Sequence, residues 1–288
     1  MRFNIVHTTR YRYSRPVFLD PHTIRLHPRY SGDQTPIHFE LTVTPEPTGM
    51  TRCLDAEENV VDRCWWEQMT DELAVTARVE ARTLRSNPYD FVLSPAATTL
   101  PMSYPGESFT GLEVYRRRAT SPYRDEAHDP VARLAHEVAD EAGGQTIDFL
   151  TALCRQISER TRHTIRETGD PQPPEQTLRD GEGACRDVAV LFSDACRVMG
   201  FAARFVSGYQ HSPEADGRRH MHAWAEVYLP FAGWRGFDPS HGLAVADHHL
   251  ALATSFAAAH ATPVLGRFRG ADVTSQMTAD IEMDHEER

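Results

Sequence analysis

Hydrophobic and polar positions alternate through most of residues 1 to 85. A period of two is typical of strands that bury one face. It recurs in Phe3 and Ile5, Tyr11 and Tyr13, Ile24 and Leu26, Ile37 to Val43, and Leu73 to Val79. Segments rich in Pro, Gly and Asp separate these runs. Strand runs and turns at this spacing predict an antiparallel β-sandwich that forms an N-terminal domain of residues 1–85.

The alternation stops in residues 86–125, where Pro and Ser are frequent. Repeated prolines disfavour a helix, because proline lacks a backbone N–H and clashes with the preceding turn. We therefore predict a packed connector in this segment. Its triple arginine, residues 116–118, is expected on a solvated face.

Helical spacing begins at Asp129, a residue type that caps helices, followed by Pro130 at the first helical position. Apolar residues then recur three or four apart to about residue 142, from 149 to 157, and from 185 to 199. Gly200 is placed to end the third run. This pattern predicts three helices, the last of them mostly buried.

Strand-like runs follow the third helix. In residues 222–229 the small apolar residues share one face, whereas His222 and Trp224 share the other. Residues 229–233 are typical of a hairpin connection to a strand that ends at Asp238. Helices before a short antiparallel sheet predict an α+β domain of residues 126–270. Residues 250–261 are expected to be helical, and 271–288 form a C-terminal strand or tail, frayed from residue 283.

Composition narrows the class of protein. A formal net charge of −11 argues against a nucleic-acid or anionic-membrane partner. The sequence has neither an apolar run of about 18 residues nor an apolar N-terminal segment, so we expect a soluble cytoplasmic protein. The oligomeric state stays open. The five cysteines form neither a disulfide framework nor a Cys-x-x-Cys metal pattern.

One compositional bias limits self-modification. All 30 basic Lys and Arg positions are Arg, which we attribute to coding bias. Because the chain has no lysine, it cannot be its own lysine cross-linking partner.

Three residues at element boundaries or on strands are the candidate catalytic groups. Cys185 begins the third helix, where free N–H groups and the helix dipole favour a thiolate and an oxyanion. The hairpin would return Asp238 toward His222. We interpret Cys185 as the nucleophile, His222 as the general base and Asp238 as its orienting carboxylate. Trp224 is a candidate wall of the substrate pocket, and neither a metal nor another cofactor is expected.

The successive motifs resemble the bacterial branch of the transglutaminase-like superfamily, which comprises papain-type cysteine enzymes. They are residues 183–187 (Gly-Ala-Cys-Arg-Asp), 202–209, 222–224 (His-Ala-Trp) and 238–239 (Asp-Pro), with 166–169 and 174–178 upstream. Residues 1–85 are similar to the β-rich region that often precedes this domain. The resemblance implies a papain-like core, the same three catalytic roles, and a peptide or protein substrate.

Several functions remain open. Attack of Cys185 on a peptide, isopeptide or carboxamide bond gives a thioester, and water as the acceptor makes the protein a peptidase or amidase. We favour this outcome, because the chain is small and lacks further sandwich domains after its core. An amine acceptor would make it a transamidase. The remaining alternatives are a non-catalytic binding module and a metal site near Asp238, using His220, His222, His241, His248 and His249.

Overall fold

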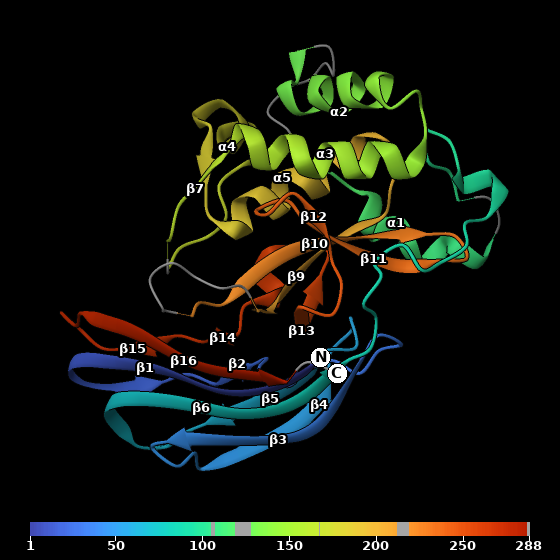
Figure 1. The fold of residues 1–288 in the computed structure, drawn as a ribbon. Helices are drawn as coiled ribbons and strands as arrows, with labels where there is room; N and C mark the ends of the chain where they lie inside the picture. Colours follow the sequence, from blue (N-terminus) through green and yellow to red (C-terminus); the bar gives the residue numbers. More distant parts are fainter. Residues whose placement is uncertain (105–106, 119–127, 167, 212–218, 287–288) are drawn as a thin grey trace.

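The computed structural model describes residues 1–104, 107–118, 128–166, 168–211 and 219–286. The chain forms two lobes stacked on one another (Figure 1). The lower lobe in that view is a β-sandwich, and the upper lobe packs helices on a sheet of its own. The first and last strands lie side by side in the sandwich lobe. The predicted α+β architecture, a β-sandwich followed by a papain-like core, is confirmed.

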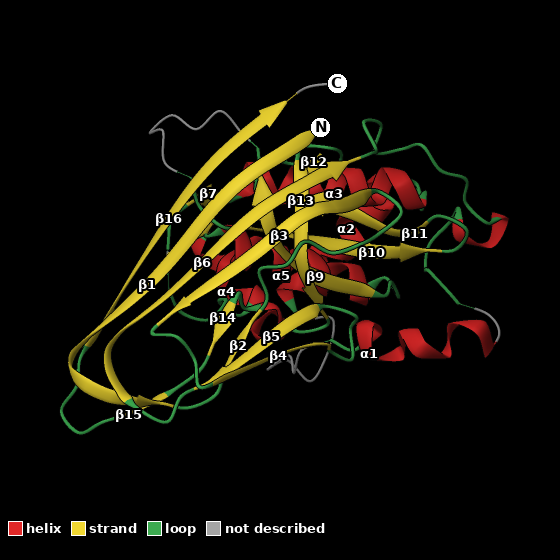
Figure 2. Cartoon of the chain, turned by 90° about the horizontal axis from the view of Figure 1, so that it is seen from below, coloured by secondary structure: helices red, strands yellow, loops and turns green. Residues whose placement is uncertain are grey.

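The large sheet of the sandwich is five-stranded and antiparallel. Its strands are β1 (Arg2–Leu19), β3 (Gln34–Thr44), β6 (Met69–Thr83), β15 (Phe268–Arg269) and β16 (Ser275–Glu286). β1 is central, because β6 pairs with one edge of it and β15 and β16 pair with the other. Figure 2 shows β16, β1, β6 and β3 running side by side along the lobe. The sheet therefore joins the beginning of the chain to its C-terminal segment.

A smaller sheet covers part of the inner face of the large one. It consists of β2 (His22–Ile24), β4 (Gly49–Leu54), β5 (Val60–Trp65) and β14 (Val264–Leu265). Along β1 and β6, buried residues alternate with more exposed ones, as expected for strands with one buried face. Cys64 and Trp66 are both buried in this core, whereas Trp65 is 40% exposed.

The upper lobe has helices over one face of a five-stranded antiparallel sheet (Figure 1). The sheet order is β12 (Leu243–Ala244), β11 (Gly233–Asp238), β10 (His222–Leu229), β9 (Ala203–Gln210) and β13 (His249–Ser255). The helices are α2 (Pro130–Glu141), α3 (Thr146–Arg160), α4 (Pro174–Asp180) and α5 (Cys185–Val198). The carboxylate of Asp129 caps α2 at 2.9 Å from the N–H of Val131, as its position predicted. The core of this lobe includes Leu191, Phe192 and Val227.

Short elements complete the chain. They are η1 (Pro95–Ala97), η2 (Glu107–Leu112), α1 (Glu113–Arg116), β7 (Arg162–His163), β8 (Glu182–Gly183) and η4 (Ala258–Ala261). Residues 105–106 and 119–125 of the expected connector lie outside the described part of the chain. The expectation of a solvated triple arginine is wrong for Arg118. Its guanidinium pairs with the buried carboxylates of Asp129 and Asp194 at 2.8 and 2.6 Å, because both need a cation on leaving water.

Three other expectations are corrected. The Ala-rich segment expected to be a helix forms β13, buried along its whole length, and then η4. Its small side chains fit between layers, so packing overrides helix propensity. Residues 283–286 are not frayed, since they belong to β16, in which Met283 is 9% exposed. β14 and β15 lie before the expected boundary at residue 270 but pair within the sandwich sheets.

Side-chain amides of the sandwich join the two lobes. The amide of Asn59 donates to the carbonyl of Thr254 at 2.9 Å and accepts its N–H at 2.8 Å. Gln34 makes the same two contacts with Ala251, both at 2.8 Å. These amides satisfy backbone groups of β13, which is the edge strand of its sheet. The lobes are therefore held in a fixed relation.

Among the described residues, no helix has both the length and the apolar character needed to cross a bilayer.

Candidate active site

The start of α5 positions Cys185. The turn before the helix is fixed by Asp187, which is 1% exposed and accepts the N–H of Ala184 at 2.7 Å. This carboxylate satisfies one of the N–H groups that a helix start leaves free. Cys185 thus stands at the first helical position, as its motif predicted, and its thiol reaches a cavity.

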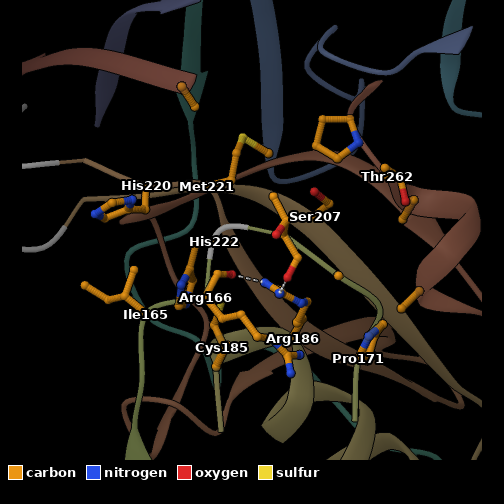
Figure 3. A pocket seen from close by; sticks show the side chains of 18 of the residues that line it. Ile165, Arg166, Pro171, Cys185, Arg186, Ser207, His220, Met221, His222 and Thr262 are labelled. Carbon is orange, nitrogen blue, oxygen red and sulfur yellow. Dashed lines mark hydrogen bonds between the residues drawn. The ribbon is translucent and has the colours of Figure 1, made fainter. Parts of the chain in front are cut away.

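A strap, comprising residues 164–166 and 168–173, is tied to this helix start. Asp187 accepts the N–H of Gln172 at 2.8 Å and pairs with Arg166 at 2.7 Å. Arg186 donates to the carbonyls of Arg166 and Thr168 at 2.5 and 2.6 Å (Figure 3). The two residues that follow Cys185 in the helix turn therefore hold the strap beside the thiol.

The β10–β11 hairpin brings His222 to Asp238. His222 is the first residue of β10 and Asp238 the last of β11, and the strands are antiparallel. The Nε2 atom of His222 lies 2.7 Å from Oδ2 of Asp238. This bond leaves Nδ1 of His222 for the thiol of Cys185, with which the imidazole interacts. The structure thus brings together all three residues predicted to be catalytic.

Asp238 is fully buried and serves more than one imidazole. Oδ2 also lies 2.9 Å from Nδ1 of His241 and 3.0 Å from Nε2 of His249, and Oδ1 accepts the N–H of Ser240 at 3.0 Å. Burial alone would raise the pKa of Asp238, but the charge of His222 and these hydrogen bonds hold it well below its usual range. The carboxylate therefore stays ionised beside His222.

The titration of the nucleophile is shifted strongly. Burial by itself raises the pKa of the Cys185 thiol, but hydrogen bonds from His163 and His222 outweigh it and lower the pKa to about 6. Burial disfavours the charged form of His222 as well, yet Asp238 and Cys185 together raise its pKa to about 10. The two shifts describe one coupled pair, a thiolate beside an imidazolium at neutral pH.

His163 is the site residue that sequence reasoning missed. It belongs to β7, a strand of only two residues that pairs in parallel with β8, opposite Gly183. That pairing brings its imidazole to Cys185 from the side of the strap. A two-residue strand has no periodicity, so no pattern in the sequence could have indicated this contact.

Trp224 does not form the expected pocket wall. Its indole lies beneath His222, with ring centroids 6.2 Å apart, and is only 1% exposed. It contacts His249 edge-on at 5.1 Å and is not among the cavity-lining residues. The strand alternation correctly put Trp224 on the face of His222, but further layers of the fold cover that face. Trp224 supports the imidazole from below.

A cavity of about 760 Å³ opens between the two lobes, with Cys185 and His222 in its lining. Figure 3 shows Arg186 beside Cys185, and strands of the sandwich lobe beyond Met221. Arg186 has no carboxylate within ion-pair distance in the described part of the chain, and His163 and His241 also line the cavity. The surface around the thiol is therefore rich in groups that carry or accept a proton.

The alternative metal site is only partly assembled. Ligand atoms of His222, Asp238 and His241 lie within 4.8 Å of one another, so these three residues could hold a metal ion. His222 and His241 each form a hydrogen bond with Oδ2 of Asp238, which accounts for the closeness of the three residues without an ion. His220 lines the cavity, and His248 lies beside Asp247 rather than Asp238.

Known proteins match the chain along most of its length. Uncharacterized proteins of Mycobacterium tuberculosis (strain ATCC 25618 / H37Rv) and Mycobacterium bovis are each 26% identical over 284 residues, which cover 92% of this chain and 87% of theirs. A solved structure from Cytophaga hutchinsonii, provisionally described as a cysteine protease, matches with a TM-score of 0.73 at 17% identity. The match covers 100% of this chain and 92% of that one. At this identity, the likeness establishes a shared fold.

Two family models match in the order that the fold requires. Residues 3–82 match the bacterial transglutaminase-like N-terminal region, and residues 132–239 match the transglutaminase-like superfamily. The second match contains Cys185, His222 and Asp238, and the two segments together span more than half of the chain. The chain therefore belongs to the transglutaminase-like superfamily and carries the N-terminal region of its bacterial members.

Proposed function

We propose that this chain is a cysteine-dependent hydrolase that cleaves a peptide, isopeptide or carboxamide bond through a thioester at Cys185. The family supports a cysteine-dependent enzyme. The observation that carries the proposal is the line of contacts from Cys185 through His222 to the buried carboxylate of Asp238, at the wall of a large cavity. Cytoplasmic location remains a prediction from the sequence.

The first half-reaction uses the ion pair. The thiolate of Cys185 attacks the carbonyl carbon, so that a C–S bond forms and the carbonyl oxygen gains negative charge. The N–H of Cys185, at the first position of the helix, is placed to donate to this oxygen. As the C–N bond breaks, the leaving nitrogen takes the proton of the His222 imidazolium, and a neutral amine departs.

The second half-reaction releases the acyl group. Water attacks the thioester carbonyl while neutral His222 accepts a proton from it. The C–S bond breaks, the thiolate returns, and the product leaves as a carboxylic acid. Asp238 supports both steps, because it fixes the ring of His222 and favours its protonated form. The two steps together consume one water and leave the enzyme unchanged.

Water is our preferred acceptor because the cavity is wide enough to admit it beside an acyl group. An amine could enter by the same route and would give transamidation with the same three residues. The acceptor is therefore a question of access and competition, to be settled by product analysis.

The test exposes the enzyme to a library of Gln-containing peptides together with a labelled primary amine, and products are identified by mass spectrometry. Cys185→Ala is the matched control. The unmodified enzyme is expected to give cleaved or deamidated peptides with little amine incorporation. The Cys185→Ala variant is expected to give none of these products. Dominant amine incorporation would replace the hydrolase with a transamidase. Absence of any product and of any adduct at Cys185 would refute enzymatic function.

A further inference from the structure

One wall of the cavity comes from the sandwich lobe. It is formed by three neighbouring cross-strand pairs of β1 and β16, namely His7 with Ile281, Thr9 with Ala279, and Tyr11 with Met277. Residues two apart on a strand share a face, so all six side chains belong to a single face of the large sheet. We name these six residues the sheet wall.

The same sheet face is buried on either side of this region. Toward the start of β1, Phe3 and Ile5 pack in one core with Tyr209 and Leu250 of the upper lobe. At the border, the hydroxyl of Tyr209 lies 2.8 Å from Nδ1 of His7. The sheet wall therefore continues a packed interface and is held opposite the upper lobe. Its His7 end is buried against that lobe, whereas Tyr11, Met277 and Ala279 at its other end remain accessible from the cavity.

The chemistry of the sheet wall suits an apolar group. Its β16 half consists of Met277, Ala279 and Ile281, and Tyr11 adds an aromatic ring. The wall offers no charged carboxylate or guanidinium, whereas Arg166 and Arg186 lie on the strap side beside the thiol. A substrate that spans the cavity thus meets charge near Cys185 and an apolar surface across from it.

We infer that the sandwich lobe is a specificity element, whose sheet wall receives an apolar side chain of the acyl donor. This inference rests on the proposed function. Because Cys185 and the sheet wall line one cavity of about 760 Å³, a donor with its carbonyl at the thiol can extend its neighbouring side chain toward β16. Donors with Leu or Phe at that position are favoured over donors with Gly, because burial removes their apolar surface from water.

The test uses peptidyl chloromethyl ketones, which alkylate Cys185 without turnover as the C–S bond forms and chloride leaves. Reagents with Leu or Gly next to the ketone are compared by their inactivation rate constants. The unmodified protein is expected to react with the Leu reagent at least tenfold faster. Ala279→Trp fills the wall and should abolish this preference. Thr278→Trp, which places the same ring on the outer sheet face opposite Arg10, should retain it.

Two readouts separate the possible failures. Iodoacetamide carries no peptide, so its rate at Cys185 should be equal in both variants if the site is intact. Equal rates for the Leu and Gly reagents in the unmodified protein would overturn the inference, as would an equal loss of preference in both tryptophan variants. If the protein prefers the Leu reagent but turns over no peptide, the proposed hydrolase function is refuted and the proposed role of the sheet wall is retained. If the protein turns over peptides but shows no preference for the Leu reagent, the hydrolase function is retained and the role of the sheet wall is refuted.

Discussion

Cys185 should be alkylated at pH 6 far faster than the other cysteines. With a pKa of about 6, the thiol is about half ionised at that pH, whereas a thiol with a pKa of about 8.5 is only about 0.3% ionised. Burial raises the pKa of Cys64 to about 11 and those of Cys154 and Cys196 well above the usual range. The thiolate fractions alone therefore favour Cys185 by more than about a hundredfold.

The assay measures iodoacetamide labelling by peptide mapping between pH 4 and 9. Cys53 is exposed, so all measurements are made in a protein that carries Cys53→Ser, which removes labelling at that position. The rate at Cys185 should fall as pH decreases through about 6, because the thiolate becomes protonated. His222→Ala removes the charge that stabilises the thiolate and should raise this midpoint by at least about one pH unit, or about 1.4 kcal/mol. Equal labelling of Cys185 and Cys196, or an unmoved midpoint in His222→Ala, would refute the reasoning.

The other predictions concern the base and the helix start. His222→Ala should lose most turnover, because it removes the imidazole that is bonded to Asp238 and that transfers the proton in both half-reactions. His220→Ala should retain at least about a tenth of the turnover of the unmodified enzyme. Steady-state kinetics that rank the two variants in the opposite order would reassign the base. Asp187→Ala should lower the free energy of unfolding by about 3 kcal/mol in urea titrations. It removes the carboxylate partner of Arg166 and the acceptor of two N–H groups, the buried one of Ala184 and the part-buried one of Gln172. The exposed Asp180→Ala is the control, and a similar small loss in both variants would contradict this role.

The position of Cys185 at a helix start and the closeness of His222 to Asp238 were predictable because local patterns indicate both. Helical periodicity and the glycines before Cys185 indicate a helix start, and strand alternation with a hairpin turn returns Asp238 to His222. Each of these relations spans few residues. The sandwich was predictable for the same reason, since its strands alternate visibly in the first 85 residues.

The remaining features depend on long-range packing. His163 reaches Cys185 through a two-residue parallel pairing that leaves no periodic signal. The Ala-rich sequence of β13 is typical of a helix. The segment is nevertheless extended, because it pairs with β9 and bonds to the side-chain amides of Asn59 and Gln34. Arg118 looks solvated until Asp129 and Asp194 are brought to it by tertiary structure. In each case the deciding partner lies beyond the range of a local pattern.

The pairing of β16 with β1 bears on how the chain folds during synthesis. β1 emerges from the ribosome well before β16, its partner along residues 2–13, because almost the whole described chain separates the two strands. Until β16 arrives, one edge of β1 is open to pairing with other strands. The upper lobe, whose sheet is built from neighbouring segments, is free to fold earlier. The sheet wall of the cavity would then be completed only when β16 docks, so closure of the large sheet would be among the last steps of folding.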